Sequence, residues 1–283
     1  MANKVKLSSK KKAKLPWLIF LVISAVIFMI PLIYAFSLSL RDQNSIFDPR
    51  LFVETDGLTF NNYKNAIQNN PTLLYNFLAS FVISSVSTIA VVFIASMAVF
   101  GFSRKYVKGR VVMYNMILST LMIPISALVI PITQLNSRFG LLDNYFGLIL
   151  PYIALNIPYA VTILQGFYLG IPKSLEEAAI IDGCSEFKLY WRIIFPLLKP
   201  GIVVIAIWTF LQCWNEFFLA LCTMTEATTK TLPLIAQQYK GVYNSQPGIL
   251  FAILILISIP MIIFYIAVQK QFVKGMTSGA VKQ

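Results

Sequence analysis

The chain has 283 residues, of which 58% are hydrophobic and 12% are charged, and its mean hydropathy is +0.74. Soluble domains carry about twice that share of charged residues, so the composition predicts an integral membrane protein. The sequence has no His and only three scattered Cys, which disfavours a metal site, a disulfide framework and His-based catalysis. A net charge of +12 then reflects where Lys and Arg lie relative to the membrane, not nucleic-acid binding.

Residues 1–15 are rich in Lys, and we expect them to form a disordered basic tail. The segment 16–270 is expected to be one transmembrane domain, and 271–283 a polar C-terminal tail. Within the domain, six apolar stretches are close to the ~20 residues that a helix needs to cross a bilayer. These expected spans are 17–38, 75–102, 111–133, 147–168, 201–222 and 248–268. The predicted fold class is therefore an all-α polytopic membrane protein with six transmembrane helices.

The distribution of Lys and Arg predicts the topology. With six spans, 17 of the 23 Lys and Arg residues fall on one side of the membrane and 6 on the other. Loops rich in Lys and Arg remain in the cytoplasm, so both termini are expected there. The predicted location is a cell membrane, with the loop 169–200 on the cytoplasmic side.

The second span carries a row of hydroxyl side chains at helical spacing. Ser80, Ser84, Ser87 and Thr88 lie on one side of it. Small polar residues in membrane helices usually pack against another helix. We favour that interpretation over a role in lining a path for solute.

The loop 169–200 contains local signals for two short helices. Ser174 followed three residues later by Glu177 is a capping-box pattern, so we expect a helix to begin there. Gly183 suits the left-handed conformation that follows a helix end. Ser185 is expected to cap a second short helix. Small side chains in the loop would let another protein approach closely.

This loop resembles the EAA loop of ABC-importer permeases, which docks a transmembrane subunit onto its ATPase. The sequence departs from the common pattern at Cys184, where Ala is usual, and at Phe195, where Leu is usual. Both changes keep an apolar side chain. The resemblance implies ATPase coupling by the residues that carry it, which are Glu177, Ala178, Ala179, Asp182, Gly183, Ile193 and Pro196.

The fifth expected span contains Glu216, the one acidic residue inside any of the six spans. A carboxylate at that depth is costly unless it is partnered or hydrated. Gln212 lies one helical turn earlier on the same face. Two interpretations stay open: Gln212, Asn215 and Glu216 line a translocation path, or Glu216 is a structural hydrogen-bonding group that ties helices together.

Four further segments narrow the resemblance to the MalG-like branch of carbohydrate importers. The similarity extends over nearly the whole chain. The segments are Trp214 to Phe218, Thr231 to Leu234, Phe139 to Tyr145, and the C-terminal stretch Phe272 to Lys282.

The resemblance implies the type I ABC-importer permease fold and a multisubunit assembly. The implied partners are a second homologous permease, a cytoplasmic ABC ATPase dimer and an extracytoplasmic sugar-binding protein. In this family the C-terminal tail reaches between the ATPase subunits. The resemblance therefore implies ATPase contacts for Lys274, Gly275 and Gly279.

An enzymatic function has little support in the sequence. The chain contains no G-x-x-x-x-G-K-[ST] phosphate loop and no plausible catalytic triad. We expect no catalytic residue, no metal and no cofactor bound by this chain, with ATP and Mg held by partner subunits. The predicted function is a permease subunit for a sugar, with an oligosaccharide favoured, that forms half of the path. The alternatives are an ABC permease for another solute, or a self-sufficient secondary transporter, which would show inverted repeats or several acids within the spans.

Overall fold

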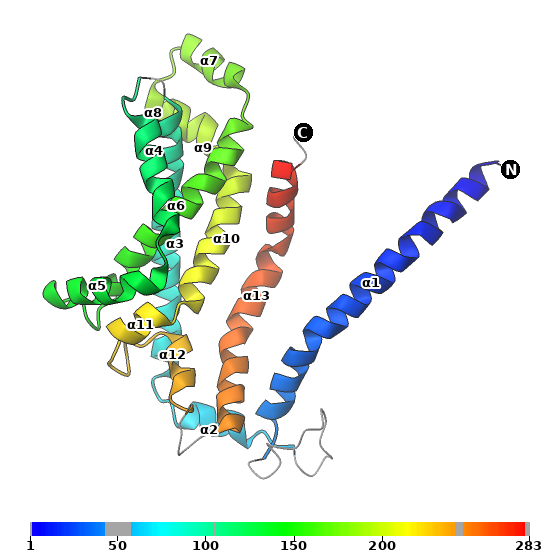
Figure 1. Ribbon diagram of the computed structural model, residues 1–283, viewed down its shortest axis with the longest axis vertical. Coiled ribbons are helices and arrows are strands. Elements are labelled where there is room, and N and C mark those ends of the chain that lie inside the picture. The colour runs from blue at the N-terminus through cyan, green and yellow to red at the C-terminus, as the bar shows by residue number, and fades with distance from the viewer. Residues whose placement is uncertain (1, 43–57, 105, 241–245, 281–283) are drawn as a thin grey trace. The chain divides into compact units, whose positions relative to one another are not determined.

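The computed structural model describes the backbone of residues 2–42, 58–104, 106–240 and 246–280, and side chains between positions 16 and 269 of those ranges. This part of the chain is helical apart from loops, turns and one isolated antiparallel bridge between Arg41 and Leu58. The fold class predicted from the sequence is confirmed (Figure 1). The chain divides into two compact units, Met1–Asn70 with Gln238–Leu256, and Pro71–Gln237 with Ile257–Gln283.

The first unit contains α1 (Ala2–Ser39), α2 (Asn61–Gln68) and the start of α13 (Pro247–Ala280). The expectation of a disordered tail over residues 1–15 is wrong for the described backbone, because α1 already begins at Ala2. Lys and Ala are good helix formers, so this segment can continue the apolar helix that follows it. Residues 16–36 of the apolar span Pro16–Ser39 are exposed or only partly buried within the protein, as expected for a helix that meets lipid or a partner, and burial begins at Ser37.

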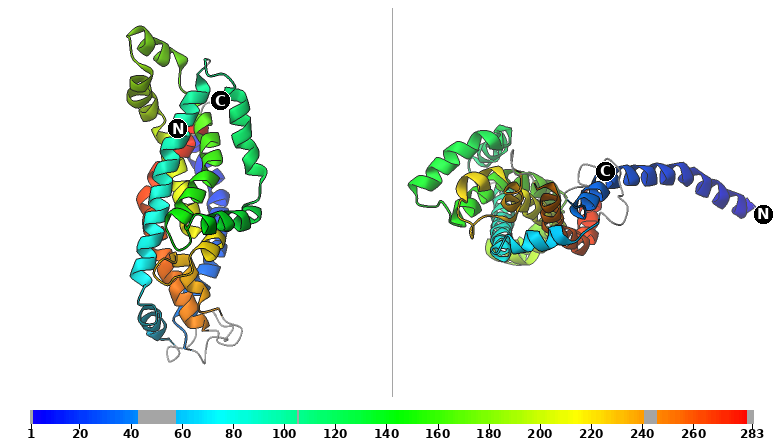
Figure 2. Two further views of the ribbon diagram at one scale, coloured as in Figure 1. Left: turned by 90° about the vertical axis from the view of Figure 1, so that its left-hand side faces the viewer. Right: turned by 90° about the horizontal axis from the view of Figure 1, so that it is seen from below.

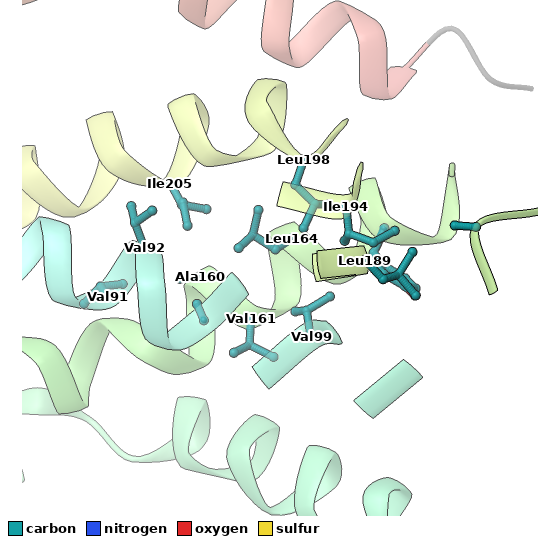
Figure 3. Close-up of a cluster of buried hydrophobic side chains, with 13 residues drawn as sticks. Val91, Val92, Val99, Ala160, Val161, Leu164, Leu189, Ile194, Leu198 and Ile205 are labelled. Atoms are coloured by element: carbon teal, nitrogen blue, oxygen red, sulfur yellow. The ribbon is translucent and has the colours of Figure 1, made fainter. Parts of the chain in front are cut away.

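The second unit is built on α3 (Leu73–Ser103), α6 (Phe146–Leu169) and α10 (Lys199–Asn215), which pack side by side (Figure 2). Small β-branched and Ala side chains of α3 and α6 fill the space between them (Figure 3). The hydroxyl row of α3 is buried, as the packing interpretation predicts. Its members are Ser80, Ser84, Ser87 and Thr88.

Two expected spans are not single straight helices. Residues 111–133 lie in α4 (Arg110–Ser119), the 3-10 turn η2 (Thr120–Met122) and α5 (Ile125–Arg138). The chain bends by 101° at this break, where Pro124 is extended and cannot continue the helix. α10 likewise ends at Asn215, and the short α11 (Phe218–Thr223) follows an extended Glu216, so the helix expected over 201–222 is interrupted.

Among the described residues, four helices are long and apolar enough to cross a membrane, and up to six spans result if each of two bent pairs counts as one. The second bent pair joins α10 to the helical segment that precedes it, with a bend of 73°. That segment comprises α8 (Glu186–Leu189), the π-helical η3 (Tyr190–Ile194) and α9 (Phe195–Leu197). The remaining helices of the second unit are α7 (Lys173–Ile181) and α12 (Leu232–Gln237).

Candidate functional site

The loop between α6 and α10 folds into a helix, a tight turn and a second helix, as expected. Gly183 follows α7 with φ +76°, the left-handed conformation predicted for it. The Gly183 N–H donates to the carbonyl of Ile180, and the Cys184 N–H donates to that of Ala179. This pair of bonds is the Schellman motif, which satisfies carbonyls that the helix end would leave unpaired.

The start of α7 differs from the expectation. The helix begins at Lys173 after an extended Pro172, and Ser174 lies inside its first turn without making a capping bond. The predicted capping box is therefore wrong. A residue with the fixed φ of Pro fits just before a helix, and Glu176 and Glu177 are left free for other contacts.

The second helix begins where the sequence predicts. The Ser185 hydroxyl accepts a hydrogen bond from the Lys188 N–H at 3.4 Å, so Ser185 is the N-cap of α8. The helix then passes through η3 and continues across Pro196. The expectation that Pro196 ends this helix is therefore wrong. Pro196 has no N–H to donate to the preceding turn, and the π-helical η3 lies directly before it in the chain.

Most of the EAA-like residues converge on one surface hollow of about 380 Å³. It lies between α7, the Gly183 turn and the helices that follow. Two EAA-like residues are elsewhere: Glu177 lines a neighbouring cavity, and Pro196 is exposed on α9. The EAA-like residues at the hollow are Ala178, Ala179, Asp182, Gly183 and Ile193.

The surface of α7 is unusually apolar for a loop helix. Leu175, Ile180 and Ile181 are 44%, 53% and 85% exposed. Ala179 is instead buried in the cluster of Figure 3, so one face of α7 packs on the bundle while the others remain open. Clustered exposed apolar side chains of this kind mark protein-interaction surfaces.

A group of charges, which the sequence analysis missed, attaches α7 to the helix bundle. The Arg104 guanidinium, at the end of α3, lies 2.8 Å from a Glu176 carboxylate oxygen. The Tyr168 hydroxyl, at the end of α6, donates to the other Glu176 oxygen at 2.6 Å. These residues border a cavity of about 680 Å³ that also includes Glu177. No periodic pattern links them, because they come from three separate helices.

Glu216 lies at the break between α10 and α11 and has three hydrogen-bond donors. The Tyr152 hydroxyl donates to one carboxylate oxygen at 2.7 Å. The N–H groups of Leu219 and Ala220 donate to the carboxylate at 2.8 and 3.0 Å. The side chain therefore caps α11 and ties it to α6, which is a structural role.

The same carboxylate also lines a cavity of about 210 Å³ between α6 and α10. Gln212 shares this cavity, as its position one turn away predicts. Tyr159 and Trp208 line it too, with their rings stacked at 4.8 Å between centroids. Asn215 is not among the lining residues; it is exposed, and its amide donates to the Leu211 carbonyl. The structure thus gives Glu216 a structural role and places it at a cavity with Gln212 but without Asn215, while the lining of a translocation path stays a prediction.

Three other predicted site residues lie outside the described side chains. Lys274, Gly275 and Gly279 belong to the last turns of α13, whose backbone is helical through Ala280. The polar tail expected from residue 271 therefore continues the helix of the last span, as far as Ala280 in the described backbone. Their ATPase contacts stay a prediction.

Asp143 joins two loops of the second unit, those that follow α5 and α11. Its carboxylate accepts hydrogen bonds from the Thr225 N–H and hydroxyl, both at 2.6 Å, and from the Glu226 N–H at 2.8 Å. The Thr229 hydroxyl donates to it at 3.1 Å. Burial raises the pKa of Asp143, but these hydrogen bonds outweigh that effect and leave its pKa below the ordinary 3.8.

The Asp143→Asn variant should unfold at a lower temperature than the wild type at pH 7. We expect a difference of about 2–4 °C, the shift that about 1 kcal/mol produces in a chain of this size. Asn tolerates the positive φ of 56° found here, so the variant removes the charge without adding backbone strain. Because the folded-state pKa is depressed, the stabilisation is full above 3.8 and is lost as the pH falls through the lower pKa.

Thermal unfolding in detergent over a pH series measures this difference. Glu226→Gln is the matched control, since the carboxylate is supplied by Asp143 and Glu226 contributes its backbone N–H. If the difference in unfolding temperature between the wild type and Asp143→Asn stays constant far below pH 3.8, the prediction is contradicted.

Comparison with known proteins identifies the chain. Residues 90–278 match the family described as binding-protein-dependent transport system inner membrane component. The chain belongs to this family. The ORF2 permease protein of Caldicellulosiruptor sp. (strain Rt8B.4) is 35% identical over 96% of this chain and 98% of that relative. The trehalose/maltose transport system permease protein MalG of Thermococcus litoralis is 31% identical over 92% of this chain and 94% of its own length.

A solved structure supports the fold of this ABC permease. The crystal structure of a bacterial ABC transporter that imports the acidic polysaccharide alginate contains a similar chain, with a TM-score of 0.78. The alignment covers 93% of this chain and 98% of that one at 22% identity. The permease is thus a multi-pass membrane subunit of a binding-protein-dependent ABC importer, in the carbohydrate-uptake group, and is not itself an ATPase.

Proposed function

We propose that this permease forms half of the translocation path of a sugar importer, with an oligosaccharide as the expected substrate. The observation that carries the proposal is a loop whose EAA-like residues gather at one hollow beside exposed apolar side chains. That arrangement suits docking of another protein, and the related MalG of Thermococcus litoralis is a permease of a trehalose/maltose transport system. A solute other than sugar is the alternative that the experiment below must exclude.

The cavity beside Glu216 supports a sugar as the solute. Tyr159 and Trp208 supply stacked ring faces, and Gln212, Asn156 and Glu216 supply polar groups around them. Binding sites of small molecules commonly combine apolar walls with a few placed polar groups. We infer that this cavity lines the path and contacts the sugar as it passes.

We infer further that the docked protein is a dimeric ABC ATPase, which holds ATP and Mg while this chain binds neither. A second, homologous permease completes the path, and an extracytoplasmic sugar-binding protein delivers the solute. Closure of the ATPases would move α7 as a rigid body, and the path would then change from inward-open to outward-open.

The docking loop and both chain termini are proposed to lie in the cytoplasm. The contact between Arg104 and Glu176 supports this topology, because it joins the basic segment 104–110 to α7 at one end of the bundle. Positively charged segments at one end favour the cytoplasmic side. The tail containing Lys274, Gly275 and Gly279 would then extend α13 toward the ATPase subunits.

Reconstituted transport tests the proposal. The permease, its partner permease, the ATPase and the binding protein are placed in proteoliposomes and given radiolabelled trehalose, maltose or maltotriose, with glutamine as the non-sugar comparison. We expect ATP-dependent uptake of at least one sugar and none of glutamine. Uptake of glutamine alone would assign another solute, and equal sugar uptake by the permeases without the ATPase would indicate a secondary transporter.

A further inference from the structure

Arg104 occupies a position where three structural elements meet. It is the first residue after α3, in an extended conformation, and its side chain is 10% exposed. Its guanidinium lies 2.8 Å from Glu176 on α7 and 3.5 Å from Glu186 on α8. It also lies 4.0 Å from the centre of the Phe100 ring, a cation–π contact with α3 itself. One side chain of the bundle therefore contacts both helices of the docking loop.

Glu176 extends this connection to a second helix of the bundle. One of its oxygens contacts Arg104, and the other accepts the hydrogen bond from Tyr168 at the end of α6. The Glu176 side chain is 13% exposed, so solvent screens these contacts little. Each carboxylate oxygen is thus tied to a different long helix.

Few other contacts fix the direction of α7. Ala179 is its one buried side chain, and three of its apolar side chains face outward. A nearly buried ion pair is not by itself strong evidence for stability, but removing one partner leaves an uncompensated charge. Two different guanidinium nitrogens face the two carboxylates, Nη1 toward Glu176 and Nε toward Glu186, which the single nitrogen of a Lys ammonium could not reproduce. The arrangement is therefore suited to setting the orientation of α7.

We propose that Arg104 is a positioning residue that holds α7 and α8 in register with the ends of α3 and α6. Movement imposed on α7 then passes to α3 and α6, whose ends border the 680 Å³ cavity and whose side chains form the core. It is not lost in a rotation of the loop relative to these helices. The proposal rests on the docking role inferred above. Arg104 acts through Glu176, Tyr168 and Glu186, and it does not itself need to touch the ATPase.

The test uses the complete transporter carrying Arg104→Met, Arg104→Lys, Glu176→Gln or Lys108→Met. Met keeps a flexible, unbranched side chain, shorter than that of Arg, without its charge, and Lys keeps the charge on a single nitrogen. Lys108, exposed in the turn between α3 and α4 and outside the 680 Å³ cavity, is the matched control. Co-purified ATPase, basal ATP hydrolysis, and hydrolysis stimulated by the binding protein with trehalose, maltose or maltotriose are measured for each variant.

We expect Arg104→Met to keep the ATPase and its basal rate but to lose about tenfold in stimulation, within the usual range of coupling between sites. Glu176→Gln should behave similarly, Arg104→Lys should restore part of the stimulation, and Lys108→Met should match the wild type. Full stimulation in Arg104→Met overturns the proposal. Loss of complex yield together with basal activity also overturns it, because Arg104 would then be a stability residue.

A second measurement reports orientation directly. Spin labels at Ile181 on α7 and Met97 on α3, both exposed, are introduced after replacement of the three Cys. The distance distribution should be narrow with Arg104 and broad with Arg104→Met, and equal widths would contradict the proposal. If the complex with the unaltered permease does not retain the ATPase or shows no stimulated ATP hydrolysis, the proposed docking function is wrong. That outcome is distinct from a failure of the Arg104 proposal alone, in which the unaltered complex is coupled and Arg104→Met is coupled equally well.

Discussion

Gly183→Val should leave the permease inserted in the membrane but reduce solute-stimulated ATP hydrolysis at least about tenfold, a change worth 1.4 kcal/mol. The φ of +76° at this position is costly for a residue with a Cβ, about 1–2 kcal/mol. Within this chain an added Cβ at Gly183 meets no atom within 4 Å. The expected loss therefore comes from a rearranged turn and from a side chain placed in the docking hollow.

Gly140→Val is the control for backbone strain. Gly140 has φ +66°, and a Cβ there also meets nothing within 4 Å, but it follows α5 and is not part of the docking loop. We expect this variant to keep the ATPase and stimulated hydrolysis within about twofold of wild type, since strain alone shifts local stability. Co-purification and hydrolysis in proteoliposomes provide both readouts. A Gly183→Val complex with full coupled hydrolysis would show that the loop is not the coupling element.

Local chemistry made the turn of the docking loop predictable. A left-handed residue after a helix favours Gly, and a Ser at a helix start offers its hydroxyl to the backbone, so Gly183 and Ser185 follow from sequence alone. The start of α7 was harder, because the pattern at Ser174 competes with Pro172. The helix begins one residue before Ser174, and Glu177, the other member of the predicted capping box, lines the 680 Å³ cavity without making a capping bond.

Apolar composition located the helices but not their breaks. Residues 201–222 are apolar enough for one span, and neither Gly nor Pro lies near the break at Glu216. The interruption is accompanied by the hydrogen bonds of Glu216 with Tyr152 on α6 and with the first turn of α11, and the former depends on the packed bundle. Pro124 did mark an interruption in the third expected span, although its 101° bend could not be read from the sequence.

Functional contacts between separate helices were the least accessible to sequence reasoning. In the sequence, Arg104 is only one of the basic residues whose distribution predicts the topology. Its contacts with Glu176 and Glu186 depend on how three helix ends meet. Gln212 and Glu216 were placed together correctly because they lie one turn apart, whereas neighbouring Asn215 points away from their cavity. Helical periodicity predicts which residues share a face, but it does not say what that face meets.

Glu216→Leu should cause the largest loss among substitutions within the spans. Three donors lose their acceptor: the Tyr152 hydroxyl and the N–H groups of Leu219 and Ala220. A buried donor left without a partner costs about 1–3 kcal/mol. We expect α11 to detach from α6, with complex yield lowered and sugar uptake reduced by more than about tenfold, equivalent to 1.4 kcal/mol.

Two further variants separate the structural role of Glu216 from its place in the path. Glu216→Gln keeps an acceptor for one N–H of α11 and can still bond Tyr152, so it loses one hydrogen bond where Glu216→Leu loses three, and complex yield should fall much less. Uptake by this variant should nevertheless fall if the carboxylate contacts the passing sugar. Asn215→Leu, next to it but outside the cavity, loses only a bond to its own helix and should change uptake little. Complex yield and uptake of radiolabelled sugar are measured for all three variants. Wild-type uptake in Glu216→Gln would leave Glu216 a purely structural role. Equal losses of uptake in Asn215→Leu and Glu216→Leu would refute the assignment of this cavity to the path.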